Sequence, residues 1–127
     1  MNNLSSLLNP SVSADQLELV NLKRSFFVRI EDVIFIQADV NYVRIVTKSG
    51  RVFVQAKTLK SYEQLLRKTD FVRTHKTYLV NFRHFADYQI TDNGTFIQLL
   101  DGKKVPVSKR RRQHVQISVT QKQGVVN

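Results

Sequence analysis

The sequence predicts a single, mainly β domain of antiparallel strands with one short helix. Short apolar and β-branched runs follow one another from Phe26 onward, and glycine-containing turns separate several of them. The clearest helix is Leu59–Lys68, which repeats its apolar residues at helical spacing. The chain has 127 residues, of which 42% are hydrophobic, and this is enough to bury one sizeable core.

The first predicted strands form a hairpin after a buried strand. Phe26–Ile30 is strand-like, and the continuous apolar run Val33–Ala38 is typical of a strand buried on both faces. Tyr42–Thr47 and Arg51–Ala56 are then joined by Lys48-Ser49-Gly50. Glycine adopts the positive φ that a three-residue hairpin loop with a bulge requires, so we expect that loop here.

The predicted helix spans Leu59–Lys68. Thr58 is the expected N-cap, and Glu63 with Arg67 has the i,i+4 spacing of a favourable ion pair. The apolar residues of the helical stripe are Leu59, Tyr62, Leu65 and Leu66. We therefore expect one face of this helix to lie on a sheet.

After the helix, the segment FVRTHKTYLVNF is apolar at both ends and polar in its centre. Three further strands are predicted as a meander: Phe85–Ile90, Thr95–Leu100 and Lys103–Val107. Thr91-Asp92-Asn93-Gly94 separates the first two, and Asp101-Gly102 predicts a tight primed turn before the third.

The two ends of the chain differ from this pattern. Residues 1–20 are rich in Asn and Ser and contain no Lys or Arg, so we predict a poorly ordered arm with a helical turn near Ala14–Val20. This arm is also a candidate surface for a protein partner. The predicted division is therefore an arm over residues 1–20, a folded domain over residues 21–120 and a tail over residues 121–127.

The charge balance indicates a polyanionic partner. The net charge is +10, and residues 1–20 hold only two charged side chains, Asp15 and Glu18. The other 107 residues hold all 20 basic side chains and 8 acidic ones, a net charge of +12. Charge of one sign at this density repels itself in a compact domain unless a partner such as DNA, RNA or an anionic surface neutralises it. The alternative is a basic surface that only keeps the protein in solution.

Several classes of function lack the residues they need. The chain has no cysteine, and its three histidines are widely spaced, so no metal site or cofactor site is predicted. Glu31-Asp32 is the only adjacent carboxylate pair, and it opens the strand at Val33 rather than facing a second acidic cluster. No nucleotide-binding glycine motif is present. We therefore predict a non-enzymatic protein, and the lack of a long apolar run or secretion signal predicts a cytoplasmic location.

Three polar, cationic segments lie where predicted strands end. They are Asp39–Arg44, Arg73–Tyr78 and Ser108–His114. Lys, Arg, Ser and Thr bind phosphate oxygens, whereas Asn, Arg and Lys also reach base edges. Each segment has a structural alternative as well, with Asn41 as a left-handed turn residue, Tyr42 as a half-buried strand aromatic and His75 as a structural histidine.

Taken in order, these segments resemble the LytTR family of bacterial DNA-binding domains. The resemblance covers about Phe26 to Arg112 and rests on VIFIQADVNYVRI, on the helix opened by Thr58-Leu59-Lys60, on FVRTHKTYLVN and on LLDGKKVPVSKRRR. Within these pieces, the patterns H-[KR]-[ST]-Y-L-V-N and G-x-x-[IV]-P-V-S-[KR]-R at this separation are far more specific than a basic run.

The resemblance implies an elongated stack of antiparallel β-sheets with one short helix. It also implies sequence-specific binding of double-stranded DNA through loops inserted into successive major grooves on one face of a bent duplex. Paired direct repeats, and therefore two copies side by side on DNA, are implied as well. Carried over by position, the DNA-binding residues are Asn41, Tyr42, Val43, His75, Lys76, Thr77, Ser108 and Lys109.

The chemistry of these side chains suggests separate roles. Lys109 is the first candidate for base readout, because an ammonium group reaches guanine O6 or N7. Lys76 is the second candidate, for a base or a neighbouring phosphate. Family members often carry Arg at the position of Lys109, so Lys here replaces a bidentate group with a point charge. The candidates for phosphate contacts are Arg110, Arg112, Thr77 and Ser108. For Arg73 two roles are open, a phosphate contact and, because it alternates into the sheet, a structural ion pair.

Two alternatives follow from the same residues. A small β-barrel for RNA or single-stranded nucleic acid would present stacking aromatics, for which Tyr42, Phe53 and Tyr88 are candidates.

The resemblance also leaves open how the chain is used, because response regulators of this family carry a receiver domain before the DNA-binding part. The residues before Phe26 are too few for a receiver, so we expect a free-standing regulator or the output module of a longer protein, and the initial Met favours the former.

Overall fold

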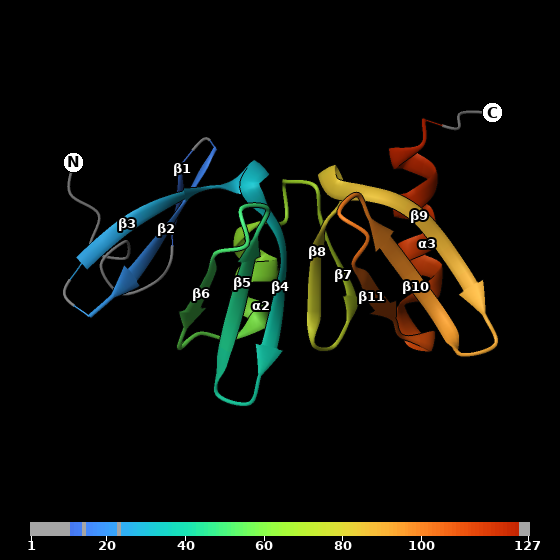
Figure 1. The fold of residues 1–127 in the computed structure, drawn as a ribbon, viewed down its shortest axis with the longest axis horizontal. Helices are drawn as coiled ribbons and strands as arrows, with labels where there is room; N and C mark the ends of the chain where they lie inside the picture. Colours follow the sequence, from blue (N-terminus) through green and yellow to red (C-terminus); the bar gives the residue numbers. More distant parts are fainter. Residues whose placement is uncertain (1–10, 14, 23, 125–127) are drawn as a thin grey trace.

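The protein is an elongated arrangement of three antiparallel sheets. The computed structural model describes residues 11–13, 15–22 and 24–124. In Figure 1 the three sheets follow one another along the long axis, with β1, β2 and β3 at one end and β9, β10 and β11 at the other. This confirms the predicted mainly β class with antiparallel sheets.

The strands pair within three groups. The first sheet has the order β1-β2-β3, from Ser11–Ser13, Gln16–Asn21 and Arg24–Arg29. The central sheet has the order β6-β5-β4-β8-β7, from Val52–Gln55, Tyr42–Thr47, Val33–Asp39, Tyr78–Asn81 and Phe71–His75. The third sheet has the order β11-β10-β9, from Lys104–Val107, Gly94–Leu99 and Phe85–Thr91. The helical segments are α2 (Leu59–Leu65), α3 (Arg112–Lys122) and the short 3-10 turns η1 (Ile30–Asp32), η2 (Phe82–His84) and η3 (Lys109–Arg111).

The β5–β6 hairpin has the predicted three-residue loop. The Thr47 amide donates to the Arg51 carbonyl at 3.0 Å, and the Gly50 amide donates back to the Thr47 carbonyl at 3.0 Å. Gly50 has a φ of +92°, which confirms the positive φ expected of it.

The turn before β11 is a second loop of this kind, so the predicted tight primed turn is wrong. The Leu99 amide donates to the Lys103 carbonyl at 2.8 Å, which leaves three residues in the loop. Gly102 ends it with a φ of +90°. The dipeptide Asp101-Gly102 is therefore the end of a longer loop, and the two-residue turn of this sheet lies between Thr91 and Gly94, which are paired.

The N-terminal part of the described chain corrects one prediction. Gln16–Asn21 is a strand rather than a helical turn, because Leu17 and Leu19 alternate onto one face and are buried in the core. Residues 1–10 of the predicted arm lie outside the described residues. The packed unit also crosses both predicted domain boundaries, since β2 passes residue 20 and α3 passes residue 121.

The predicted helix is present but shorter, and its charged pair is different. The Thr58 hydroxyl accepts a hydrogen bond from the Ser61 amide at 3.1 Å, which confirms Thr58 as the N-cap. Glu63 pairs with Arg73 at 2.7 Å instead of with Arg67. Arg67 donates to the Gln64 carbonyl of its own helix at 3.0 Å.

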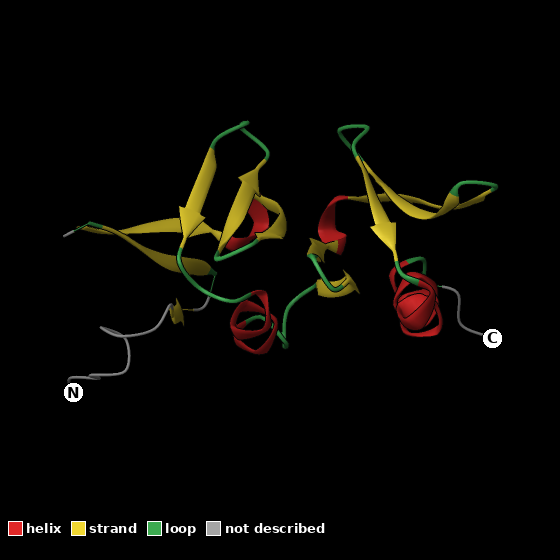
Figure 2. Ribbon diagram, turned by 90° about the horizontal axis from the view of Figure 1, so that it is seen from below, coloured by secondary structure: helices red, strands yellow, loops and turns green. Residues whose placement is uncertain are grey.

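A second helix, α3, follows the third sheet and was not predicted. Val115 and Val119 on one face are buried in the same cluster as residues of β10 and β11. Figure 2 shows α2 and α3 on the same side of the strands. No helix in the described part of the chain is long and apolar enough to cross a membrane.

A buried asparagine fixes the start of the central strand. Asn81 at the end of β8 donates through its side-chain amide to the carbonyls of Val33 at 2.8 Å and Ile30 at 3.2 Å. Its side-chain oxygen accepts from the Arg83 amide at 3.1 Å. These bonds satisfy a polar group that is fully buried, and they set where β4 begins relative to β8.

Candidate nucleic-acid interface

Two of the three predicted segments lie at the same end of the central sheet. β4 runs antiparallel to both β5 and β8, so the β4–β5 turn and the β7–β8 turn are neighbours. Gln37 pairs with Tyr78, and the Ala38 amide donates to the Thr77 carbonyl at 2.9 Å. Both turns are at the lower edge in Figure 1.

The third segment is hydrogen-bonded to the second. The Ser108 amide, just after β11, donates to the Thr74 carbonyl of β7 at 2.9 Å. This bond places the junction between β11 and α3 beside the β7–β8 turn. We call this end of the molecule the loop edge: the β4–β5 turn (39–42), the β7–β8 turn (75–78) and the β11–α3 junction (108–112).

The β4–β5 turn exposes two predicted residues and buries a third. Asp39 pairs with Tyr42, so Val40 and Asn41 form the tip. Asn41 and Tyr42 are exposed. Val43 is only 1% exposed and its side chain lies in the core, because β5 alternates and turns that residue inward.

The strained residue of this turn is Val40 rather than Asn41. Val40 has a φ of +52° and is 93% exposed, and Asn41 does not have a positive φ. The left-handed region is unfavourable for a β-branched side chain. The left-handed alternative considered for Asn41 is therefore wrong by one position.

The β7–β8 turn presents Lys76 to solvent between two half-buried residues. The Thr77 amide donates to Nδ1 of His75 at 3.2 Å, and the Thr77 hydroxyl lies 3.0 Å from the same nitrogen. Because Nδ1 accepts the amide bond, the neutral ring carries its proton on Nε2. Burial lowers the pKa of His75, and the charges of Lys76, Arg111 and Arg73 lower it further. Tyr78 packs against the core beside Phe35.

Arg73 has the structural one of its two alternative roles. Its side chain is 12% exposed and forms an ion pair with Glu63 of α2 at 2.7 Å. Its Nε donates to the His75 carbonyl at 2.8 Å, and its second Nη donates to the Lys76 carbonyl. All three of these contacts are made within the protein.

The β11–α3 junction holds the basic run. Lys109 and Arg110 are exposed, whereas Ser108 and Arg112 are half-buried. Arg111 was not among the predicted residues, yet its charge acts on His75, and the charges of Arg73 and Glu63 act on it. The run folds as a 3-10 turn, which separates side chains that are adjacent in sequence, and the sequence gives no signal of that turn.

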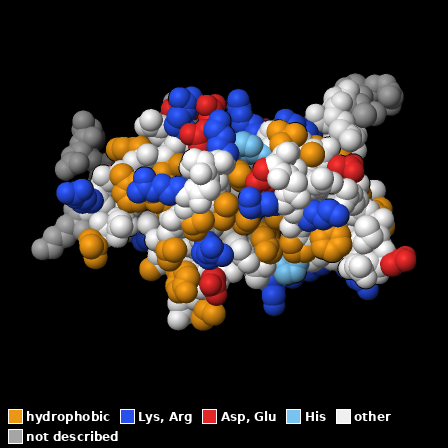
Figure 3. Space-filling view, viewed as in Figure 1, with side chains coloured by type: hydrophobic (Ala, Val, Ile, Leu, Met, Phe, Trp, Pro, Cys, Tyr) orange, Lys and Arg blue, Asp and Glu red, His pale blue; other side chains and the backbone are white. Residues whose placement is uncertain are grey.

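Three cations on the opposite edge of the central sheet, Arg29, Lys48 and Arg83, are paired with carboxylates. The Glu31 carboxylate forms ion pairs with Arg29 at 2.7 Å and with Arg83 at 3.7 Å, and the Asp32 carboxylate forms one with Lys48 at 3.4 Å. In Figure 3, Lys and Arg are mixed with Asp and Glu along the upper margin.

The cations of the loop edge are free by comparison. Within the described residues, no ion pair is formed by Lys76, Lys109 or Arg110. These three ammonium and guanidinium groups, with the amide of Asn41 and the hydroxyl of Thr77, are the donors that phosphates and base edges accept. The edge therefore has the chemistry of a nucleic-acid interface.

Comparison with known proteins gives the same result. The family model of the LytTr DNA-binding domain matches residues 23–118. The chain is 35% identical over 107 residues to a response regulatory protein of Vibrio cholerae, covering 84% of this chain and 43% of that protein. It is 31% identical over 88 residues to the transcriptional regulatory protein BtsR of Escherichia coli, covering 68% of this chain and 36% of that protein. The chain thus spans less than half the length of these curated relatives.

A solved structure has the same fold. It is the LytTr DNA-binding domain of a methyl-accepting/DNA response regulator from Bacillus cereus, with a TM-score of 0.72 and 19% identity. The match covers 84% of this chain and 98% of that one. With the family model matching three quarters of its length, the chain belongs to the LytTR family of DNA-binding domains.

Proposed function

We propose that this chain is the sequence-specific, double-stranded DNA-binding part of a cytoplasmic bacterial transcription regulator, and that it acts by binding rather than catalysis. The observation that carries the proposal is the loop edge, where three segments distant in sequence lie together with unpaired cations. The names of the relatives, which are response regulatory and transcriptional regulatory proteins, support the regulatory part.

The mode of binding follows from the shape of this edge. The family resemblance implies turns inserted into successive major grooves on one face of the duplex, and turns that project from strand ends (Figure 1) support this mode without a recognition helix. We assign base contacts to Lys76, Lys109 and Asn41, and phosphate contacts to Thr77, Ser108, Arg110 and Arg112. Bending of the duplex would let all three segments engage at once. Paired direct repeats would then hold two copies side by side.

The aromatic residues offer less support for the single-stranded alternative. Phe53 packs against Phe26 at 5.2 Å and lies under Arg51, whereas Tyr88 belongs to a different sheet and packs against the other core cluster. A stacking platform needs aromatic faces exposed together on one surface. Tyr42 is exposed, but Phe53 and Tyr88 are partly buried and pack against two separate core clusters.

Selection of bound sequences from a random duplex pool at physiological salt tests the proposal. We expect a defined site that contains two direct repeats, bound less tightly as salt rises because log K falls by about 0.9 for each phosphate neutralised. A preference for single strands over duplex at equal salt, or a flat response to salt, would contradict the proposal.

A further inference from the structure

The side chain of Arg73 connects the helix α2 to the turn that carries Lys76. Its guanidinium donates to the Glu63 carboxylate at 2.7 Å, to the His75 carbonyl at 2.8 Å and to the Lys76 carbonyl. Two consecutive peptide carbonyls of the β7–β8 turn are thus bound by one rigid group. Arg73 lies on β7 just before the turn, so a side chain next to the turn holds two of the turn's own backbone carbonyls.

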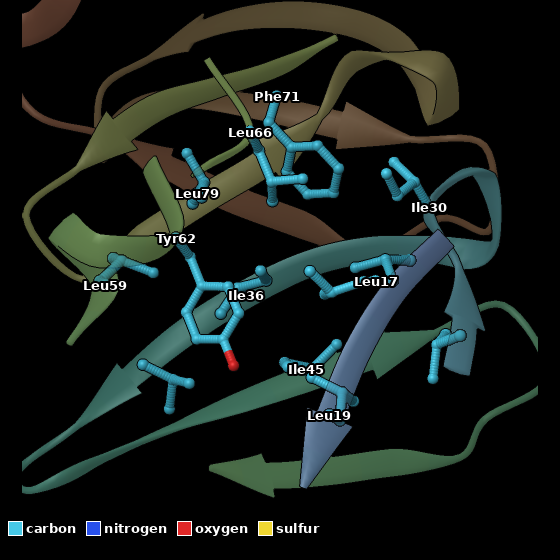
Figure 4. Packing of buried hydrophobic residues seen from close by; sticks show 13 residues of the cluster. Leu17, Leu19, Ile30, Ile36, Ile45, Leu59, Tyr62, Leu66, Phe71 and Leu79 are labelled. Carbon is cyan, nitrogen blue, oxygen red and sulfur yellow. The ribbon is translucent and has the colours of Figure 1, made fainter. Parts of the chain in front are cut away.

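The other end of this connection is fixed by the core. Glu63 lies on α2 between residues that are buried against the central sheet. Figure 4 shows Leu59, Tyr62 and Leu66 facing Ile36 and Leu79. Because α2 is held by this packing, the Glu63 carboxylate is a fixed point from which Arg73 holds the turn.

We propose that Arg73 is a positioning residue for DNA binding, and that Glu63 holds it in place. Neither side chain needs to touch the duplex. Arg73 sets the path of the backbone at residues 75 and 76, so the Lys76 side chain leaves the loop edge in one direction and less conformational entropy is lost on binding. This inference rests on the proposed function of the loop edge.

The chemistry of the site requires a guanidinium group. Three acceptors from two elements surround Arg73, and a planar group with donors on both sides reaches all of them. A lysine has the same charge but a single nitrogen. Arg73→Lys therefore keeps the net charge of the protein while it removes the hold on the turn.

The test compares two variants with one matched control. Arg73→Lys and Glu63→Gln should each weaken binding to the selected duplex by about tenfold, the effect expected from losing one or two charge-assisted hydrogen bonds. The control is Glu31→Gln on the opposite edge, because Glu31 has the same exposure of 39% as Glu63 and also accepts an arginine at 2.7 Å. Its duplex affinity should not fall.

The sign of the Glu63→Gln effect is decisive. Removal of a negative charge strengthens DNA binding if only the overall field matters. Weaker binding by Glu63→Gln than by Glu31→Gln supports the positioning role, and equal or tighter binding overturns it. Arg73→Gln adds a second criterion, because its slope of log K against log salt should match that of the wild type. A slope less negative than that of the wild type by about 0.9 would mean that Arg73 itself neutralises a phosphate.

A measurement without DNA separates this inference from the proposed function. Amide hydrogen exchange at Thr77 should be faster in Arg73→Lys than in the wild type, with unchanged exchange in the buried strand β4. If the wild type does not bind duplex, the proposed function fails while the exchange result still reports on the turn. If the wild type binds and exchange at Thr77 is unaffected, the positioning role fails alone.

Discussion

At the scale of single residues, Lys76 and Lys109 are exposed and unpaired within the described chain, so their charges are available to a ligand. Lys76→Ala and Lys109→Ala should each weaken binding to the selected duplex by about 1–3 kcal/mol, the range for a base contact. Neither should lower Tm, because neither side chain packs in the core. Fluorescence anisotropy and thermal denaturation measure the two quantities.

Lys48→Ala is the matched control for these variants. Lys48 is also exposed, but it lies at the opposite edge and pairs with Asp32 at 3.4 Å. Its removal should leave duplex affinity close to that of the wild type at physiological salt. A Lys76 or Lys109 variant that melts earlier while binding normally would remove that residue from the interface.

Val40 stores backbone strain at the tip of the β4–β5 turn. A β-branched residue at a φ of +52° is unfavourable, and asparagine tolerates this region better. Val40→Asn should therefore stabilise the protein by about 1 kcal/mol, measured by chemical denaturation. The control is Val54→Asn on the strand β6, which is also exposed and where asparagine is disfavoured. Equal effects of the two substitutions would show that the positive φ has no energetic consequence.

His75 gives the turn a pH dependence. Its pKa in the folded state lies below the ordinary 6.5, because of burial first and then of Lys76, Arg111 and Arg73. As the pH falls below 6.5, His75 is therefore protonated more readily in the unfolded chain than in the folded chain. His75 costs stability in that window, and the cost grows until the lowered pKa is reached. Protonation of Nδ1 also removes the bond from the Thr77 amide.

Urea unfolding at about pH 7.5 and about pH 5.5 measures this contribution. The wild type should lose more stability between the two values than His75→Gln, whose amide does not titrate. The difference between the two proteins isolates His75 from the other histidines and the carboxylates. A loss of equal size in both would assign the pH dependence to those other groups.

At the scale of elements, α3 is held by very few apolar residues. Val115 is fully buried and Val119 is nearly so, whereas Ile117 on the other face is 54% exposed. Val115→Ala should cost about 2 kcal/mol of stability, and Ile117→Ala should change it by less than about 0.5 kcal/mol. Chemical denaturation of the two variants tests whether α3 is part of the folded unit. Equal small effects would mean that the helix packs only loosely.

The elements that local sequence predicts well are those with a strong local cause. Gly50 fixes a hairpin loop, Thr58 starts a helix, and the apolar run at Val33 forms a central strand. The helix α3 has no capping side chain and a stripe of only two buried valines, so no periodic signal indicates it. β2 was missed because its two buried leucines alternate over a stretch too short to outweigh the polar composition around it.

At the scale of the whole molecule, the loop edge depends on long-range pairing. The sequence placed cationic residues at three strand ends, but their meeting requires β4 to pair with both β5 and β8, and Ser108 to bond to Thr74. Only the family resemblance predicted that meeting. The burial of Val43 and the contacts of Arg73 are likewise set by the sheet and by α2, so they became clear only in three dimensions.

The arrangement of charge over the molecule gives a last prediction. The net charge of +10 could act as a uniform field, or the loop edge alone could meet the phosphates. The double variants Lys76→Ala/Lys109→Ala and Lys48→Ala/Arg29→Ala each remove two positive charges, the first from the loop edge and the second from paired groups on the opposite edge.

Only the loop-edge pair should change how duplex binding responds to salt. For that variant the slope of log K against log salt should become less negative by up to about 1.8, or about 0.9 for each lysine that neutralises a phosphate. The opposite-edge variant should keep the slope of the wild type, because counterions screen charges that lie more than about 10 Å from the duplex. If both slopes became less negative by the same amount, net charge rather than the arrangement of the three turns would govern binding. Only a localised interface distinguishes two proteins of equal charge.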